Sequence, residues 1–123
     1  MGDKTIEFTD EILNLIAQRF KAMSDPTRLR ILHLLRGQEM SVGEIAEAAR
    51  LKHGTASANL MALYKAGLVA HRKEGTKVLY RIGNPMVFKV CDGVCESLKE
   101  EFVEMERIRM NLEAIEGRKE GQS

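Results

Sequence analysis

Cys91 and Cys95 stand four residues apart in a segment that we expect to be helical. At that spacing both thiols lie on one helix face, where they could hold a thiophilic ion such as As(III), Cd(II), Pb(II) or Hg(II). Two sulfurs are fewer ligands than such ions prefer, so a complete site would need a partner subunit or an exogenous thiol. Alternatively, both cysteines are small apolar residues of a packed interior. The sequence leaves both readings open.

Positive charge is concentrated between residues 50 and 82. This segment holds seven Lys or Arg and a single acid, Glu74, whereas the whole chain of 123 residues has a formal net charge of +1. A local patch of cations can bind the phosphates of DNA, and a nearly neutral chain excludes attraction through its whole surface. The alternative is an ordinary solvated basic surface. The basic residues are Arg50, Lys52, Lys65, Arg72, Lys73, Lys77 and Arg81.

Short polar side chains accompany this charge in the helix that we predict from about residue 53 to 66. Such side chains reach base edges in the major groove without bulk, although they also occur on ordinary helix surfaces. We expect base contacts from this helix and its start, at Lys52, His53, Thr55, Ser57 and Asn59. We expect backbone contacts from the tip of a hairpin, at Arg72, Lys73 and Lys77.

The elements that must position these residues follow the order of a winged helix-turn-helix, a mainly α fold with a β-hairpin wing. Ser41 and Glu44 have the spacing of a capping box, and Asp25 and Asn84 each precede a proline that suits a first helical turn. β-favouring residues on both sides of Glu74-Gly75-Thr76 predict the hairpin. We predict helices over about 9–22, 26–36, 42–49, 53–66 and 86–115, and strands over 69–72 and 78–82.

The first and last helices carry apolar stripes that we expect to form a homodimer. The spacing in the last helix is close to 3.5 residues, which favours pairing with another long helix. We therefore expect one domain over 1–123, with a DNA-reading core at 24–82 and dimerisation helices at 9–22 and 86–115. The expected interface residues are Ile12, Ile16, Phe20, Val87, Cys91, Val94, Leu98, Phe102 and Met105.

Several classes of protein are not expected. The chain has no apolar run of about 20 residues that would cross a membrane and no N-terminal signal-peptide pattern, so we expect a cytoplasmic protein without a membrane partner. It has no nucleophile–base constellation, no phosphate loop and no metal-hydrolase spacing, so we do not expect an enzyme. Its three histidines, His33, His53 and His71, fall on separate predicted elements and form no metal site.

Four segments together resemble the ArsR family (ArsR/SmtB) of bacterial repressors. They are Ser24-Asp-Pro-Thr-Arg-Leu-Arg-Ile-Leu32, Val42-x-Glu-Ile-Ala46, Asn59-Leu-x-x-Leu-x-x-Ala-Gly-Leu-Val69 and Arg72-Lys-Glu-Gly-Thr-Lys-Val-Leu-Tyr80. The resemblance covers about residues 8–105. It implies a homodimer on the first and last helices, an operator with inverted-repeat symmetry, and repression until an inducer binds.

The metal sites of that family carry over poorly to this chain. Where one family site has two cysteines, this chain has Ser41 and Gly43. Where another has histidines and acids, it has Asn84, Met86, Ser97 and Glu100. We therefore predict a DNA-binding repressor with no certain cofactor, released by a thiophilic ion or a reactive sulfur or oxidant at Cys91 and Cys95. The alternatives are a winged-helix interaction module, or a repressor whose cysteines only pack.

Overall fold

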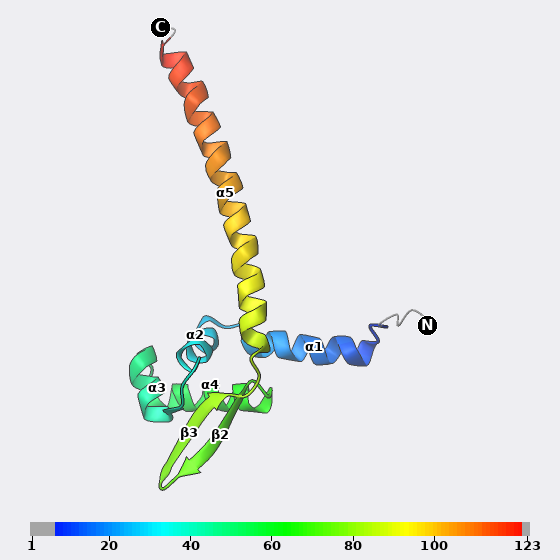
Figure 1. Ribbon diagram of the computed structural model, residues 1–123, viewed down its shortest axis with the longest axis vertical. Helices are drawn as coiled ribbons and strands as arrows, with labels where there is room; N and C mark the ends of the chain where they lie inside the picture. Colours follow the sequence, from blue (N-terminus) through cyan, green and yellow to red (C-terminus); the bar gives the residue numbers. More distant parts are fainter. Residues whose placement is uncertain (1–6, 122–123) are drawn as a thin grey trace. The chain divides into compact units, whose positions relative to one another are not determined.

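The computed structural model describes residues 7–121, with side chains to residue 118. The chain divides into two compact units, one ending at Val87 and one beginning at Phe88, and each is described by itself. Figure 1 traces the helices and the β2–β3 hairpin along the described chain. The elements are α1 (Asp10–Met23), α2 (Pro26–Leu34), β1 (Met40–Ser41), α3 (Val42–Ala49), α4 (His53–Lys65), β2 (Val69–Glu74), β3 (Lys77–Ile82) and α5 (Met86–Gly121).

Local caps start the helices where the sequence predicts. The Asp25 carboxylate accepts a hydrogen bond from the Arg28 amide at 3.0 Å, with Pro26 in the first turn of α2. Asn84 Oδ1 accepts from the Met86 amide at 3.0 Å at the start of α5. These bonds satisfy amides that have no partner inside their own helix, so both predicted starts are confirmed.

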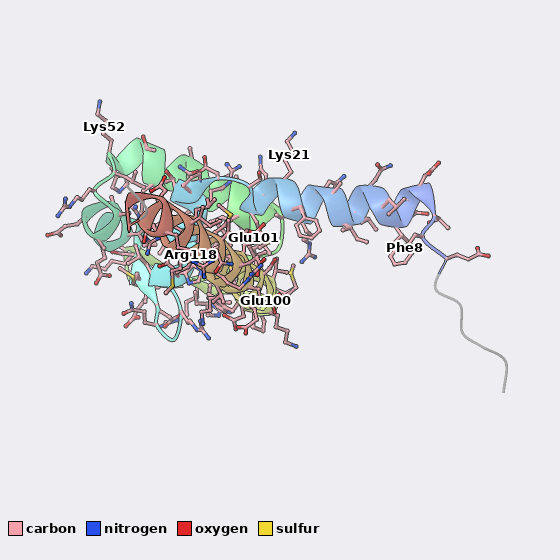
Figure 2. The ribbon with its side chains drawn as sticks, turned by 90° about the horizontal axis from the view of Figure 1, so that it is seen from above. Phe8, Lys21, Lys52, Glu100, Glu101 and Arg118 are labelled. Carbon is pink, nitrogen blue, oxygen red and sulfur yellow. The ribbon has the colours of Figure 1, made fainter. Side chains whose placement is uncertain are left out.

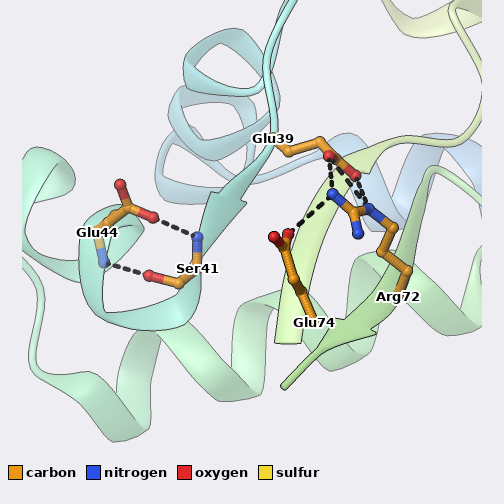
Figure 3. Close-up of polar contacts among 5 residues, drawn as sticks. All are labelled: Glu39, Ser41, Glu44, Arg72 and Glu74. Atoms are coloured by element: carbon orange, nitrogen blue, oxygen red, sulfur yellow. Dashed lines mark hydrogen bonds and ion pairs between the residues drawn. The ribbon is translucent and has the colours of Figure 1, made fainter. Parts of the chain in front are cut away.

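Ser41 and Glu44 form both halves of the predicted capping box. Ser41 Oγ accepts from the Glu44 amide at 3.2 Å, and Glu44 Oε1 accepts from the Ser41 amide at 2.9 Å (Figure 3). At the other end of α3, Arg50 adopts a left-handed conformation with φ 56°, which turns the chain into α4. Residues other than glycine adopt this conformation at an energetic cost, so the turn depends on the packing of both helices.

The hairpin is part of a three-stranded antiparallel sheet in the order β1-β3-β2. β2 and β3 pair from Val69 opposite Ile82 to Glu74 opposite Lys77, around a turn in which Gly75 has φ 63°. The predicted hairpin is therefore confirmed, with strands that extend nearer to the tip. The sequence did not predict β1, which pairs Met40 with Tyr80 and so ties the start of α3 to the wing.

The core of the first unit lies between α2, α3, α4 and the sheet. On α4 the side chains of Ala56, Leu60 and Leu63 are fully buried, which leaves the opposite face of that helix for solvent. Val87 is also fully buried within the single chain. Its prediction as a dimer contact is therefore wrong, because a side chain enclosed in the core of its own protomer presents no surface to a partner.

Helix α5 is longer than predicted. It runs to Gly121 rather than ending at Ile115. Ion pairs one turn apart join Glu104 to Arg107 and Arg109 to both Glu106 and Glu113. Such pairs support a solvent-exposed helix, and the isolated glycines Gly93 and Gly117 do not end it.

Candidate DNA interface

The face of α4 that points away from the core is polar and exposed. Lys52, His53, Thr55 and Ser57 are all exposed, and Ala56 between them is fully buried, so the helix is cleanly two-sided here. Lys52, the residue just before the helix, projects outward in Figure 2. A helix with an exposed row of small polar groups and a cation at its start has the dimensions and chemistry to enter a major groove.

Asn59 is less available than its neighbours. Its side chain is half-buried, and its amide nitrogen donates to the Thr55 carbonyl at 2.9 Å, one turn earlier in the same helix. An amide group has two donors and an acceptor, so this bond leaves one N–H and the carbonyl oxygen for another partner. A base contact from Asn59 would therefore use only part of its hydrogen-bonding capacity unless the side chain turns outward.

His53 and Lys77, which the sequence assigned to different elements, come together in the structure. Both line a hollow of about 240 Å³ at the start of α3 and α4 beside the wing. The remaining lining comes from Ser41, Val42, Gly43 and Val78. A histidine from the helix and a lysine from the hairpin thus face one surface, where a DNA backbone could contact both.

Arg72 does not present a free charge to that surface. Its Nε lies 2.9 Å from Glu39 Oε2 and its Nη2 lies 2.8 Å from Glu39 Oε1, a two-point ion pair, and Nη2 also lies 3.0 Å from Glu74 Oε2 (Figure 3). Hydrogen bonding to Arg72 lowers the pKa of Glu39, and Glu39 in turn raises the pKa of Arg72. Two carboxylates therefore offset one guanidinium, and the sequence count of a basic wing overstates its free positive charge.

Lys73 and Lys77 carry the accessible charge of the hairpin tip. Both are exposed, and neither belongs to an ion pair within the described residues. They lie on paired strands near the tip, where Lys73 is opposite Val78 and Lys77 is opposite Glu74. Of the three predicted backbone contacts, these two have the geometry of a phosphate-binding tip.

An aromatic contact that the sequence did not predict joins α4 to the sheet. The Tyr64 ring lies 4.3 Å from the His71 ring on β2, and His71 lies 5.3 Å from Tyr80 on β3 in an edge-on arrangement. Ring pairs at these separations are attractive beyond their buried area. The contact fixes the root of the wing against the helix whose polar face is described above.

Cys91 and Cys95 on α5 form no disulfide with each other, and Cys91 is half-buried whereas Cys95 is exposed. Partial burial raises the pKa of the Cys91 thiol, and the neighbouring Cys95 and Asp92 raise it further. Within the described residues no group of three or more His, Cys, Asp or Glu side chains is placed to hold a metal ion. One chain therefore offers a two-sulfur site at most.

Comparison with known proteins identifies the fold. Residues 23–72 match the family model for a helix-turn-helix domain. A homodimeric winged helix-turn-helix DNA-binding domain from Mycobacterium bovis, Mb0332, described as "a possible ArsR-family transcriptional regulator", is 36% identical and has a TM-score of 0.68. The match covers 82% of this chain and 94% of that one. The chain belongs to the ArsR family.

Two curated relatives match over part of their length. The HTH-type transcriptional regulator Rv0324 of Mycobacterium tuberculosis is 43% identical over 64% of this chain and 35% of its own length. A "Probable mercury resistance operon repressor" of Streptomyces lividans is 35% identical over 58% of this chain and 57% of its own. The chain thus spans about a third to a little over half of these relatives. No helix in the described part is long and apolar enough to cross a membrane.

Two positions where other ArsR-family proteins bind metal have structural roles in this member. Ser41 caps α3 and Asn84 caps α5 through the hydrogen bonds given above. A capping side chain has its oxygen committed to a backbone amide, so it is poorly placed to coordinate an ion. In this chain these two positions are therefore occupied by helix caps.

Proposed function

We propose that this protein is a homodimeric, sequence-specific transcriptional repressor that reads DNA with α4 and grips the backbone with the hairpin tip. The observation that carries the proposal is the exposed polar face from Lys52 to Ser57 beside Lys73 and Lys77. Two copies related by a two-fold axis would place two α4 helices in successive major grooves of an inverted-repeat operator, about 34 Å apart. This surface contains polar side chains that can contact bases and lysines that can contact phosphates, but no arrangement of catalytic side chains.

Dimerisation through α1 and α5 completes the proposal. Ile12, Ile16 and Phe20 on α1 are 38%, 37% and 52% exposed in the single chain. A row of large apolar side chains on one helix face is unusual for a surface that stays in water. Its burial by a second copy agrees with the homodimeric state given for the Mb0332 domain.

Binding to DNA is tested by titrating fluorescent duplexes from the promoter of the protein's own gene against a shuffled duplex of equal length. We expect tighter binding to the promoter, and an affinity for both duplexes that falls as salt rises. Replacing Thr55 and Ser57 with Ala should reduce the preference for the promoter while leaving binding to the shuffled duplex nearly unchanged. Absence of binding to any duplex at low salt would favour a winged-helix interaction module.

Release from DNA is assigned to chemistry at Cys91 and Cys95. One-turn spacing places both sulfurs on one side of α5, and the Streptomyces lividans relative bears the name of a mercury resistance repressor. Oxidants react with the thiolate form of a cysteine, so the raised pKa of Cys91 slows oxidation. A thiophilic ion displaces the thiol proton when it binds, so the raised pKa hinders metal binding less. The ligands missing from one chain would come from the partner subunit or a small thiol.

The cysteine assignment is tested by measuring promoter affinity with and without Hg(II), Cd(II), As(III) or polysulfide. The comparison is between the wild-type protein and Cys91→Ser/Cys95→Ser. We expect the additions to weaken binding by the wild type and to leave the double variant unaffected. Equal responses in both proteins would support the second candidate, a repressor whose cysteines only pack, which the half-buried state of Cys91 favours.

A further inference from the structure

The exposed face of α4 has an apolar centre. Gly54, Ala58 and Met61 follow one another at spacings of four and three residues, which places them on one side of the helix. All three are exposed, and at about 100° per residue their side lies opposite the fully buried Ala56 and Leu60. A groove that receives this face of α4 therefore meets an apolar stripe, with the exposed polar side chains of the helix beside it.

Met61 is the large side chain of this stripe. It is 46% exposed and lies one turn after Ser57, on the same side of the helix. Tyr64 is also exposed, but its ring stacks on His71 at 4.3 Å, so the root of the wing accounts for its position. Isolated apolar side chains are common on protein surfaces. Exposure alone therefore assigns no role to Met61, and its surroundings must decide.

The charges around Met61 favour DNA as the molecule that covers it. The segment from Lys52 to Lys65 has a lysine at each end and no acidic residue between them. Both lysines are exposed, and neither belongs to an ion pair within residues 7–118. Phosphates border the major groove on both sides, so cations at the two ends of a helix complement a groove that the helix enters. Met61 then faces the base edges.

The chemistry of the groove determines what Met61 can recognise there. Base edges in the major groove present hydrogen-bond donors and acceptors, and their apolar group is the C5 methyl of thymine. A thioether is only a weak acceptor, so against other edges it would leave polar groups unpaired, whereas against a methyl it buries apolar surface. Ala58 is small, and a Cβ at Gly54 would meet nothing within 4 Å. Both positions therefore allow the helix to approach the bases closely.

We propose that Met61 reads a thymine in each half-site through the C5 methyl group of that base. The inference rests on the proposed function and adds the chemical group that one side chain recognises. Gly54 and Met61 are about 10 Å apart along the helix axis, or about three base pairs, so this thymine lies within about three base pairs of the bases that Thr55 and Ser57 contact. Burying one methyl group changes affinity about fourfold, and two half-sites multiply to about 15-fold.

The first experiment removes the methyl group and leaves the rest of the base unchanged. Duplexes that the wild-type protein selects from a randomised pool are remade with deoxyuridine in place of one thymidine in each half-site, and binding is titrated by fluorescence anisotropy. We expect a thymine position at which this double replacement weakens wild-type binding about 15-fold. If the protein binds equally well when each thymine in turn is replaced, the proposal is wrong.

The second experiment assigns that effect to Met61. Met61→Ala should bind the thymine and uracil duplexes equally, whereas Met61→Leu keeps an apolar side chain and should retain most of the difference. Met110→Ala is the control, because it makes the same change at an exposed methionine of α5 and should keep the whole difference. Ala and Leu are strong helix formers, and thermal unfolding checks that each variant folds. A uracil effect of the same size in wild type and Met61→Ala would overturn the proposal.

A salt titration distinguishes a base contact from a disturbed backbone contact. Methionine carries no charge, so the slope of log K against log salt should be the same for wild type and Met61→Ala, and a shallower slope in the variant would contradict a contact limited to the base edge.

The outcomes also separate this inference from the function on which it rests. A pool in which no duplex is enriched would contradict the sequence-specific repressor and, with it, the role of Met61. Enriched duplexes whose uracil effects do not depend on Met61 would contradict the inference alone and leave the repressor in place.

Discussion

The pairing of Arg72 with Glu39 determines how much charge the wing offers to DNA. If the pair stays closed on DNA, removing both charges together in Arg72→Gln/Glu39→Gln should leave the slope of log K against log salt near the wild-type value. Lys73→Gln, which removes an accessible cation, should make this negative slope shallower by about 0.9. The measurement is a salt titration of promoter binding for the three proteins. A double variant that loses as much slope as Lys73→Gln would show that Arg72 leaves Glu39 to contact a phosphate.

Residues that act locally were predictable, whereas those paired over a long distance were not. Asp25, Ser41 and Asn84 cap helices within three residues of themselves, so composition and spacing alone indicate their roles. Glu39 and Arg72 lie 33 positions apart and meet only because β1 joins the sheet. For that reason the charge count between residues 50 and 82 missed the acid that offsets Arg72.

At the scale of elements, Gly83 follows β3 directly and lies close against the backbone at the start of β2. A Cβ at this position would lie 3.0 Å from the Val69 carbonyl carbon and 3.2 Å from the Ala70 nitrogen, both backbone atoms that cannot turn away. We expect Gly83→Ala to lower the free energy of unfolding by about 1–3 kcal/mol, measured by urea denaturation. Gly93→Ala is the control: a Cβ there has open space inside α5 and should stabilise the helix by up to about 1 kcal/mol. Equal effects of the two would contradict the close approach.

The capping box of α3 predicts a pH dependence of stability. The Ser41 amide, and then the Ser41 side chain, lower the pKa of Glu44 from its ordinary value of 4.5. A carboxylate with a lower pKa in the folded state stabilises the fold above its unfolded pKa, and this contribution is lost as the pH falls through the folded value. The stability advantage of wild type over Glu44→Gln should therefore shrink between about pH 6 and about pH 3. Thermal unfolding across this range provides the measurement, and a constant difference would contradict the assignment.

The helices and strands that could be predicted are those whose own residues carry a cap, a buried line or a turn sequence. α3 carries its own capping box, α4 has a buried line along one face, and the hairpin has its own turn residues, so their positions followed from the sequence. β1 has only two residues and exists through its pairing with β3, which no local pattern reports. The end of α5 was also missed, because the helix continues through Gly117 to Gly121, and one glycine costs a helix only about 1 kcal/mol.

At the scale of the whole molecule, the affinity for DNA should depend on dimerisation, so that a change that weakens the dimer also weakens DNA binding. An inverted repeat presents two half-sites, so a dimer gains affinity from the second α4 without any new contact, as linked binding sites generally do. The same linkage provides a route for release. Chemistry at Cys91 and Cys95 that changes the angle between protomers would move one α4 out of register with its groove while leaving each winged domain folded.

This linkage predicts that a substitution on α1, on a helix face outside the polar surface of α4, weakens operator binding. Ile16→Glu places a charge in the exposed apolar stripe of α1, and Gln18→Glu makes the same charge change at another exposed position of that helix. We expect Ile16→Glu to weaken both the dimer and binding to a full inverted repeat by at least about 100-fold, with Gln18→Glu close to wild type. Binding to a single half-site should stay the same in both variants, because each winged domain keeps its α4 and wing. If half-site binding fell together with full-site binding, the loss would lie in the fold of the reading domain and not in the dimer.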